Sequence, residues 1–383
     1  MTSITNLKTI VKSQVKNLTL LLGGTAAMSL GINASAMAAV MYDVTELGSL
    51  GEPFSYAYDI NDRGEVVGYF GDYLNRAFLW KSSTGINDLG TLPGKDNSVA
   101  NGINNAGKVV GYSDNRAFLW NRNTGMVDLG TLPNQSSSEA IAINNQDWVV
   151  GNSGNRAFLW NRNNGMTNLG TLGGGSSSSA ADINDAGQVV GNSDNRAFLW
   201  NETQGMQNLG TLPNKDFSSA AAINNLGQVV GYSGNINEYY RDRAFLWSES
   251  TGAIDLGALP GRIPESPDDT ASYAYDINDA GQVVGVASVP YSTAFLWSES
   301  TGIVDLNTLI DPNSEWRLNV ATAINNQGQI VGYSRFGSFD YRAFLLTPKS
   351  PQSVPEPMTI GGSIIAGAAL LYLRRRQYGL SQG

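Results

Sequence analysis

Apolar and polar positions alternate along this chain in short runs, and the pattern of runs returns about every 40 residues. In the unit from Val99 to Leu132, a run of small residues comes first, and a β-branched run around Val109 and Val110 follows. The apolar phrase Arg116 to Trp120 and a run from Met126 to Leu132 complete the unit. Turns of Asn-x-Gly or Thr-Gly between the runs supply residues that accept the positive φ values of tight hairpins. The pattern predicts four antiparallel strands in each unit.

The unit is written seven times with little change. Six copies contain Ala-Phe-Leu-Trp and a seventh reads Ala343 to Leu346; the six begin at Ala77, Ala117, Ala157, Ala197, Ala244 and Ala294. An Ile-Asn phrase precedes each copy, at Ile60, Ile103, Ile143, Ile183, Ile223, Ile277 and Ile324. Strand-only repeats of this length, with Gly-rich turns and regularly spaced aromatics, are typical of propeller blades. The sequence therefore predicts an all-β, seven-bladed β-propeller of four-stranded blades over residues 40–348.

Residue size predicts the order of the strands within a blade. The strand nearest a propeller axis is the most crowded, and the Ser/Ala-rich phrase at Ser178 to Ile183 is small enough to fit there. A Leu-Gly-Thr-Leu-like phrase follows the first six copies and would be outermost, whereas a seventh, Leu47 to Leu50, stands before the first repeat. We expect this displaced strand to complete the blade that begins at Ala321, because that pairing removes an open sheet edge. The alternative makes Leu-Gly-Thr-Leu innermost and leaves seven blades without this closure.

Several side chains that repeat are interpreted as scaffold. The Trp that ends each Ala-Phe-Leu-Trp phrase is predicted to pack between neighbouring sheets, with Leu346 in the seventh place. An arginine precedes the phrase in six units, with Thr293 in the other, and is predicted to pair with carboxylates or carbonyls rather than to bind an anion. These arginines are Arg76, Arg116, Arg156, Arg196, Arg243 and Arg342. The phrase Asp59 to Gly64 resembles a calcium loop, but Arg63 stands where a ligand is needed, so we interpret it as a hairpin.

Composition excludes several kinds of chemistry. The chain of 383 residues has no Cys and no His, which excludes disulfides, Cys or His zinc sites, Cys nucleophiles and Ser-His-Asp triads. It carries 24 basic and 33 acidic residues, and both ends are basic, so the repeat region is more acidic than the whole chain. An acidic body repels nucleic acid and anionic lipid. We therefore expect cations, neutral glycans or proteins as partners, with no nucleic acid, no cofactor and no metal.

Residues 1–39 are predicted to be a secretory signal peptide. Lys8, Lys12 and Lys16 lead into the mostly apolar run Leu20 to Ile32, and the small residues Ala34 to Ala39 offer A-x-A cleavage sites. A retained membrane anchor is the alternative, but the apolar run is short and interrupted by glycine. We therefore expect export.

Residues 355–383 resemble the PEP-CTERM sorting signal of exported bacterial proteins, after a linker over residues 349–354. The three parts of that signal are present in order: Pro355, Glu356 and Pro357, the short apolar stretch Met358 to Leu373, and the basic cluster Arg374, Arg375 and Arg376. The resemblance implies an exosortase-type sorting enzyme as partner and delivery to the cell surface or an extracellular matrix. It also implies membrane insertion, at least transiently, through a short C-terminal transmembrane helix. An ordinary C-terminal membrane anchor is the alternative.

The repeat itself resembles the HAF repeat of predicted extracellular bacterial proteins. The shared pattern is Ile-Asn-x-x-Gly-x-Val-Val-Gly, then Ala-Phe-Leu-Trp, then Asp-Leu-Gly-Thr-Leu, and it extends from about Tyr42 to Thr347. Those repeats are named for His-Ala-Phe, whereas this chain has Arg-Ala-Phe in six copies and Thr-Ala-Phe in one. The resemblance implies export and a repeat fold, and it implies no known reaction.

A binding site is expected where the copies differ, because identical positions hold the scaffold together. Units two to four are nearly uniform, whereas long variable segments occur in units five, six, seven and one, which are neighbours in a closed ring. Each of these segments joins a second strand to a third or a fourth strand to the next first strand, so all of them emerge on one face. The predicted ligand-binding residues in them are Tyr73, Glu238, Tyr239, Tyr240, Asp242, Asp269, Tyr291, Trp316, Phe339 and Tyr341.

Aromatic rings beside carboxylates suit sugar rings, cations or a protein partner. The leading hypothesis is an exported, non-catalytic propeller that binds a glycan or a protein through this sector. The second is a glycoside hydrolase acting on exopolysaccharide, with a carboxylate pair drawn from Glu238, Asp242, Glu265, Asp269 and Glu315. The third is a purely structural matrix component.

Overall fold

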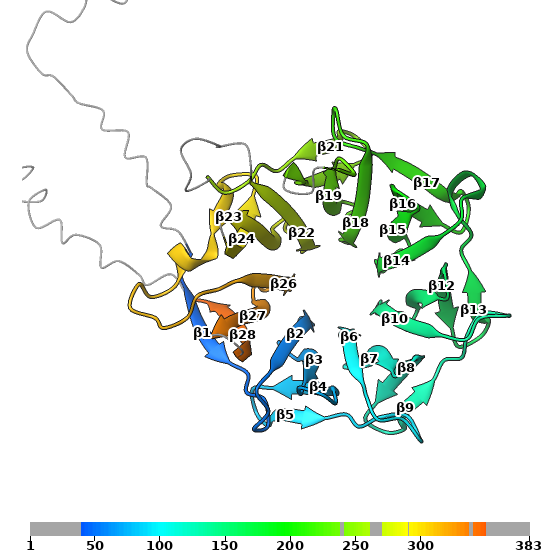
Figure 1. Cartoon of the computed structure of the whole chain (residues 1–383), viewed down its shortest axis with the longest axis horizontal. Helices are drawn as coiled ribbons and strands as arrows, with labels where there is room; N and C mark the ends of the chain where they lie inside the picture. Colours follow the sequence, from blue (N-terminus) through cyan, green and yellow to red (C-terminus); the bar gives the residue numbers. More distant parts are fainter. Residues whose placement is uncertain (1–39, 238–240, 261–269, 290, 337–339, 350–383) are drawn as a thin grey trace, which may run out of the picture. The chain divides into compact units, whose positions relative to one another are not determined.

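The computed structural model describes residues 40–349 except 238–240, 261–269, 290 and 337–339, and gives the backbone alone at 289 and 291. In this part of the chain, seven four-stranded antiparallel sheets are arranged around a central axis (Figure 1). The prediction of a seven-bladed β-propeller is confirmed. The predicted signal peptide and the predicted sorting signal lie outside the described residues. Among the residues that are described, no helix has both the length and the apolar character needed to cross a membrane.

Blades 1 to 4 follow one another along the chain. Blade 1 contains β2 (Ser55–Ile60), β3 (Val66–Phe70), β4 (Arg76–Lys81) and β5 (Gly85–Asp88), and blade 2 contains β6 (Val99–Ile103), β7 (Val109–Ser113), β8 (Arg116–Asn121) and β9 (Gly125–Asp128). Blade 3 contains β10 (Ser138–Ile143), β11 (Val149–Ser153), β12 (Arg156–Asn161) and β13 (Gly165–Asn168). After the 3-10 turn η1 (Leu172–Gly174), blade 4 contains β14 (Ser178–Ile183), β15 (Val189–Ser193), β16 (Arg196–Asn201) and β17 (Gly205–Gly210).

Blades 5 to 7 are less regular. Blade 5 contains β18 (Phe217–Ile223), β19 (Val229–Gly234), β20 (Arg243–Ser248) and β21 (Gly252–Asp255), and blade 6 contains β22 (Ala271–Ile277), β23 (Val283–Val289), β24 (Tyr291–Ser298) and β25 (Gly302–Asp305). The 3-10 turn η3 (Leu306–Leu309) leads to blade 7, which contains β26 (Val320–Ile324), β27 (Ile330–Phe336) and β28 (Asp340–Pro348). The N-terminal strand β1 (Tyr42–Glu46) supplies the fourth strand of blade 7.

The order of strands within each blade agrees with the size argument. The Ser/Ala-rich strands lie nearest the axis and strands such as β5 and β9 lie at the rim (Figure 1). The outermost strand is shorter than the sequence predicted, because β9 ends at Asp128 and does not reach Leu132. Leu129 and Leu132 lie in the link that follows, and both are buried. In blade 2 the Leu-Gly-Thr-Leu phrase therefore lies in the link to blade 3 rather than in a strand, whereas β17 of blade 4 extends to Gly210.

The predicted closure of the ring is confirmed. The strand that pairs lies just before the displaced phrase that was predicted to pair. β1 pairs with β28 from Tyr42 opposite Pro348 to Glu46 opposite Phe344. Leu47, which begins the displaced phrase, donates its backbone N–H to the carbonyl of Ala343. Because the pairing is antiparallel, the described chain enters and leaves the propeller at one place, where the Lys349 N–H donates to the Met41 carbonyl at 2.7 Å.

The core lies between the blades, because each sheet packs a neighbour on both of its faces. The cluster between blades 1 and 2 joins Val67 and Leu79 of one sheet to Ile103 and Phe118 of the next. Phe118 and its equivalents are fully buried, and Trp120 covers the edge of the same cluster. Leu346 takes the corresponding place in blade 7 and is fully buried. The interpretation of the repeated Trp and Leu346 as packing residues is therefore confirmed.

Glycine after the Val-Val pair is required by a β-bulge in each inner strand. In blade 2 the pairing of β6 with β7 shifts register between Ala100 and Gly102. A Cβ at Gly111 would lie 1.9 Å from the Val99 carbonyl oxygen, which no side chain tolerates. The bulge bends the inner strand and turns the Ile-Asn phrase toward the axis.

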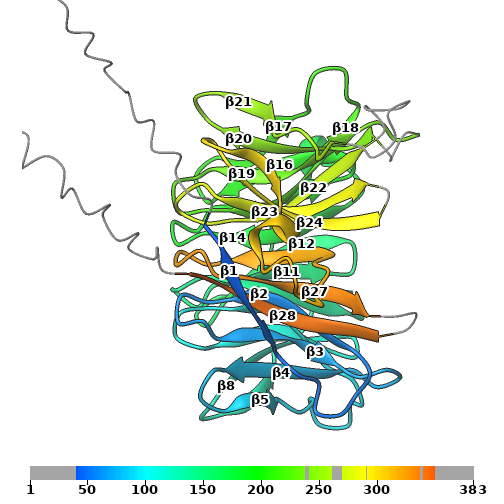
Figure 2. The same cartoon turned by 90° about the vertical axis from the view of Figure 1, so that its left-hand side faces the viewer.

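The propeller has two different faces. We call the face with the turns between first and second strands the ring face, and the opposite one the loop face. The loop face carries the connections between second and third strands and the links between blades. The hairpins β23–β24 and β27–β28 extend on this side in Figure 2. The described chain enters and leaves on the ring face, because β1 begins and β28 ends there.

Candidate binding site

Two of the variable segments on the loop face are extended strands rather than loops. The ladder between β23 and β24 continues to Val289 opposite Tyr291. The ladder between β27 and β28 continues through Arg335 opposite Tyr341 to Phe336 opposite Asp340. Backbone pairing therefore places Arg335 and Tyr341 opposite each other on a strand ladder, which is a better base for a binding site than a loop.

The structure places four of the ten predicted ligand-binding residues with their side chains. Tyr73 is 93% exposed near the tip of its loop, and Asp242 is only 2% exposed. Trp316 is half-buried and packs edge-on against Phe344, with 6.0 Å between ring centroids. Tyr341 lines two cavities. The backbone alone is described for Tyr291, and the remaining five lie outside the described residues: Glu238, Tyr239, Tyr240, Asp269 and Phe339.

Tyr341 separates two cavities on the loop face. The seam 7–1 cavity, between blades 7 and 1, has a volume of about 640 Å³ and is lined by Glu46, Ser49, Gly51, Glu52, Pro53, Ser55, Phe336, Asp340, Tyr341 and Arg342. The seam 6–7 cavity, between blades 6 and 7, has a volume of about 470 Å³ and is lined by Ser292, Arg317, Asn319, Val320, Tyr333, Arg335 and Tyr341. Both cavities lie within the sector of blades that the sequence singled out.

A cluster of half-buried tyrosines supports Tyr341. Its ring stacks on Tyr56 with 5.5 Å between centroids and an interplanar angle of 28°. Tyr56 in turn stacks on Tyr69 at 4.8 Å and meets Tyr333 edge-on at 4.9 Å. Burial raises the pKa of Tyr56 and Tyr69 above the ordinary tyrosine value. Two members of this cluster, Tyr333 and Tyr341, line the cavities themselves.

The seam 7–1 cavity contains a fixed ion-pair network. The Arg342 guanidinium donates to Asp340 Oδ2 at 2.9 Å, approaches Glu46 Oε2 at 3.6 Å, and lies over the Phe336 ring at 4.6 Å. These partners hold the arginine in place and raise its pKa. The predicted structural role of the repeated arginines is confirmed here and in other blades. Arg76 pairs with Asp88, Arg116 pairs with Asp128, and Arg156 donates to the Ser176 carbonyl.

Asp242 is buried on the loop face of blade 5, at the position where blades 1 to 4 have asparagine. Its Oδ2 accepts a hydrogen bond from the Tyr273 hydroxyl at 3.2 Å, whereas its Oδ1 has no hydrogen-bond partner among the described residues. Burial raises the pKa of this carboxyl group. A Cβ at Gly234 would lie 1.7 Å from Oδ1, so the glycine makes room for the carboxylate.

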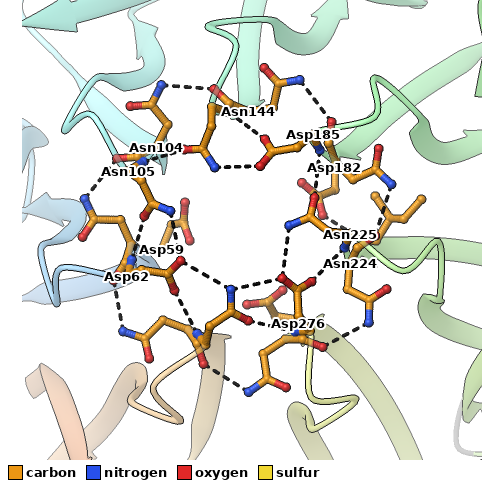
Figure 3. A pocket seen from close by; sticks show the side chains of 18 of the residues that line it. Asp59, Asp62, Asn104, Asn105, Asn144, Asp182, Asp185, Asn224, Asn225 and Asp276 are labelled. Atoms are coloured by element: carbon orange, nitrogen blue, oxygen red, sulfur yellow. Dashed lines mark hydrogen bonds between the residues drawn. The ribbon is translucent and has the colours of Figure 1, made fainter.

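Two closed rings of side chains on the ring face were not foreseen from the sequence (Figure 3). In the amide ring, the Asn that follows each Ile donates its side-chain N–H to the carbonyl of the equivalent Asn in the next blade, at 3.0 to 3.1 Å. Seven such bonds close the circle, and the last runs from Asn325 to Asn61. The members are Asn61, Asn104, Asn144, Asn184, Asn224, Asn278 and Asn325.

The second ring is formed by the residue that follows each of these asparagines. Its backbone N–H donates to the side-chain Oδ1 of the equivalent residue in the following blade, at 2.8 to 3.0 Å. Its members are Asp62, Asn105, Asn145, Asp185, Asn225, Asp279 and Asn326, and together with the amide ring they line an axial cavity of about 180 Å³. Each ring needs a short side chain with an oxygen acceptor in all seven blades. The Ile-Asn-Asn or Ile-Asn-Asp phrase in every repeat is the signal that could have predicted them.

Three aspartates just inside the rings bridge neighbouring blades. Asp182 accepts the backbone N–H of Ile183 at 2.7 Å and that of Ile223, in the next blade, at 2.9 Å. Burial raises the pKa of Asp59 to about 6 and that of Asp182 to about 7, and it raises the pKa of Asp276 well above the ordinary value. The blades that have a bridging aspartate before the Ile also have an aspartate in the second ring, because their phrase reads Asp-Ile-Asn-Asp. No group of three or more acidic side chains placed to hold a metal ion is found in the part of the chain that the structure describes.

Comparisons with known proteins support the fold and leave the activity open. The pattern of a family described as "Protein of unknown function (DUF3466)" matches residues 213–336, from just before β18 to the end of β27. The chain therefore contains a DUF3466 segment within a seven-bladed propeller, and the segment covers less than half of the chain. No curated protein sequence matches the chain.

Solved propellers resemble this chain at low sequence identity. Virginiamycin B lyase from Staphylococcus aureus is 11% identical with a TM-score of 0.54, and the likeness covers 80% of this chain and 100% of the lyase. A catalytically inactive histidine-to-alanine variant of that lyase with quinupristin gives the same values. The extracellular domain of a putative one-component system from B. thetaiotaomicron is 12% identical with a TM-score of 0.51, and the likeness covers 80% of this chain and 39% of that one. These likenesses show the fold alone.

Proposed function

We propose that this chain is an exported, surface- or matrix-associated propeller that binds a glycan, without chemical change, on the loop face at blades 7 and 1. The observation that carries the proposal is the position of Tyr341 between two cavities of about 640 and 470 Å³. Cavities of this size, with aromatic walls and a few fixed polar groups, are typical of small-molecule and sugar sites. The tyrosine cluster provides a ring surface on which a sugar can stack, and the polar groups provide hydrogen bonds to its hydroxyls.

A glycan fits the loop face better than a folded protein partner does. Protein interfaces have an apolar centre, and large exposed apolar patches are the usual sign of one. The exposed large apolar side chains in the described part of the chain are dispersed, for example Val127 in blade 2, Leu226 in blade 5 and Leu74 in blade 1. The concave surface beside Tyr341 is instead lined mostly by polar groups and tyrosines.

We further propose that the first 39 residues direct export and that residues 355–383 are sorted by an exosortase-type enzyme. The support is the order of motifs in the sequence: a basic and apolar leader at one end, and Pro-Glu-Pro, an apolar stretch and three arginines at the other. Cell fractionation tests this part. The full chain is expected at the cell surface or in the matrix, and a chain that lacks residues 355–383 is expected to be released into the medium.

Binding is tested with the full-length chain on an array of neutral and acidic oligosaccharides, followed by calorimetry on the best ligand. Tyr341→Ala is expected to weaken binding by at least about tenfold, because it removes the ring between the two cavities. Tyr341→Phe keeps the ring and is expected to retain most of the affinity. Thermal melts of both variants show whether the propeller remains folded.

Tyr73→Ala is the matched control, because Tyr73 is an exposed tyrosine on the same face that lines neither cavity. An equal loss from both alanine variants would place the site on the wider loop sector instead of the cavities. Absence of glycan binding by the folded wild-type chain would overturn the proposal. Release of new reducing ends from a bound glycan would show hydrolysis, and would favour a carboxylate-dependent hydrolase over a binding protein.

A further inference from the structure

Blade 7 differs from all other blades in the charge at two equivalent positions on the loop face. The first position lies three residues before the inner-strand residue that pairs with the fourth residue of the second strand, and the second position lies just after the regular part of the second strand. Blade 2 has Asp96 and Asp114 there, blade 4 has Ser176 and Asp194, and the remaining blades outside blade 7 have acidic, small or proline residues. Blade 7 has Arg317 and Arg335. Both positions therefore carry a positive charge in the one blade that bears Tyr341.

In regular blades, the second of these positions holds the link before the inner strand. Asp114 Oδ1 accepts the backbone N–H of Asn97 at 3.2 Å, and Asp194 accepts the backbone N–H groups of the equivalent link in blade 4. In blade 7 the hydrogen bond runs in the opposite direction, from the second strand to an asparagine in the link. Asn319 Oδ1 accepts the Arg335 backbone N–H at 2.8 Å, and Asn319 Nδ2 donates to the Ser292 carbonyl at 2.9 Å. Asn319 therefore holds the link in blade 7, whereas an aspartate holds it in blades 2 and 4.

Arg317 and Arg335 both line the seam 6–7 cavity, together with Tyr333 and Tyr341. The described residues that line this cavity include no acidic side chain, whereas Glu46, Glu52 and Asp340 line the cavity on the other side of Tyr341. The concave surface thus changes from acidic to basic across one tyrosine. Guanidinium groups bind carboxylates and sulfates through paired, charge-assisted hydrogen bonds.

We infer that the seam 6–7 cavity binds a negatively charged sugar residue, with its anionic group on Arg317 and Arg335 and its ring beside Tyr341. This inference rests on the proposed function, because it names the class of glycan that the loop face takes. The acidic composition of the chain favours neutral or cationic partners, and the two arginines reverse that preference locally. A carboxylate-bearing uronate and a sulfated sugar present the same anionic chemistry to the arginines.

The test measures affinity of the full-length chain for hexamers of galacturonate, glucuronate and mannuronate, each against its carboxyl-reduced neutral counterpart, and for a sulfated neutral hexamer. At least one anionic hexamer is expected to bind about tenfold or more tightly than its neutral counterpart. The uronate and sulfated arms distinguish the two sources of negative charge. Equal binding of anionic and neutral hexamers would overturn this inference and leave the proposed glycan binding intact, whereas absence of all binding would overturn both.

The double variant Arg317→Gln and Arg335→Gln is expected to abolish the preference for the anionic hexamer, so that the variant binds the anionic and the neutral hexamer equally. Arg122→Gln with Arg162→Gln is the matched control, because it removes the same charge from exposed turns of blades 2 and 3. A preference that survives in the first variant, or disappears equally in the control, would contradict the assignment. If the double variant melts early, Arg317→Gln alone, in the exposed link before β26, provides the same reading.

Discussion

Asp59 joins two blades through its carboxylate, which accepts the backbone N–H of its own neighbour Ile60 at 2.7 Å and that of Ile103, in the next blade, at 2.8 Å. Asp182 and Asp276 make the same bridge elsewhere in the ring. In the other four blades the position is occupied by Gly or Ala. The three bridges serve six of the seven Ile N–H groups, because each carboxylate accepts two.

The burial of these aspartates predicts that the propeller is more stable at mildly acidic than at mildly basic pH. The pKa of Asp59 is raised to about 6 and that of Asp182 to about 7, against about 3.9 in an unfolded chain. The folded state therefore binds protons more tightly, so the stabilisation is complete below pH of about 3.9 and is lost as the pH rises through about 7. Thermal melts are expected to show a higher Tm at pH 5 than at pH 8.

Other blades have alanine at the equivalent position, for example at Ala142 and Ala222. Replacing all three bridging aspartates with alanine is expected to flatten this pH dependence. It should also lower the Tm at pH 8, because backbone N–H groups lose their acceptors. Asp72→Ala is the control, since Asp72 is exposed on the loop face. An unchanged slope of Tm against pH in the triple variant would contradict the assignment of the titrating groups.

Loss of one member of the amide ring is expected to destabilise the whole propeller. Asn184 donates to the Asn224 carbonyl at 3.1 Å, and its Oδ1 accepts the backbone N–H groups of Ala186 and Gln188. Asn184→Ala leaves these groups without partners in a buried turn and is expected to lower the free energy of unfolding by about 3 kcal/mol. Chemical denaturation measures it, and Asn163→Ala in an exposed turn is expected to stay within about 0.5 kcal/mol of wild type.

The strand that closes the ring is expected to matter as much as a core strand. Tyr42 is buried between β28 and the link to blade 7, in the cluster that contains Leu306 and Leu346. Tyr42→Ala is expected to cost about 3 kcal/mol through the cavity that it leaves. Asp43→Ala, next to it, changes only an exposed ion pair with Lys349 and is expected to cost less than about 1 kcal/mol. Similar losses from both variants in denaturant titrations would mean that β1 does not close the ring in solution.

Glycine at the bulge is predicted to be irreplaceable. A Cβ at Gly191 would lie 2.0 Å from the Ser179 carbonyl oxygen and 2.9 Å from Ala180 Cα, both in the inner strand. Gly191→Ala is therefore expected to cost about 3 kcal/mol or to prevent folding. Asn192→Ala, the next residue in β15, is half-buried and provides the control for the same strand. Equal melting temperatures for the two variants would show that the inner strand yields to the added methyl group.

The fold was predictable because the sequence pattern of each repeat indicates its strands and turns. The small residues of Ser178 to Ile183 fixed the inner position, and the displaced phrase at Leu47 indicated the closure of the ring. The exact length of the outer strand was not predictable, since Leu129 and Leu132 look like strand residues but are buried in a link. Apolar character alone does not distinguish a strand from a buried connection.

The candidate site was predictable only in its general location. Variable segments in blades 5, 6, 7 and 1 indicated the sector, and Tyr341 was among the residues chosen. Arg335 is not among the predicted residues, because its position in the cavity depends on a hairpin that extends past the regular blade. The side-chain rings at the axis were missed for a similar reason, since Asn61 and Asn325 are neighbours only after the ring closes. Contacts between distant repeats are set by closure and not by any local pattern.

The described chain enters the propeller at Met41 and leaves it at Lys349, and both residues lie on the ring face, opposite the cavities beside Tyr341. If the C-terminal segment attaches the protein to a surface, as we propose, the attachment begins on the face opposite the cavities beside Tyr341. A long polymer can then lie across Tyr341 without meeting the layer that holds the protein. Copies attached side by side would all present these cavities outward. Together they would bind one polymer chain at many points, with an avidity well above that of one copy.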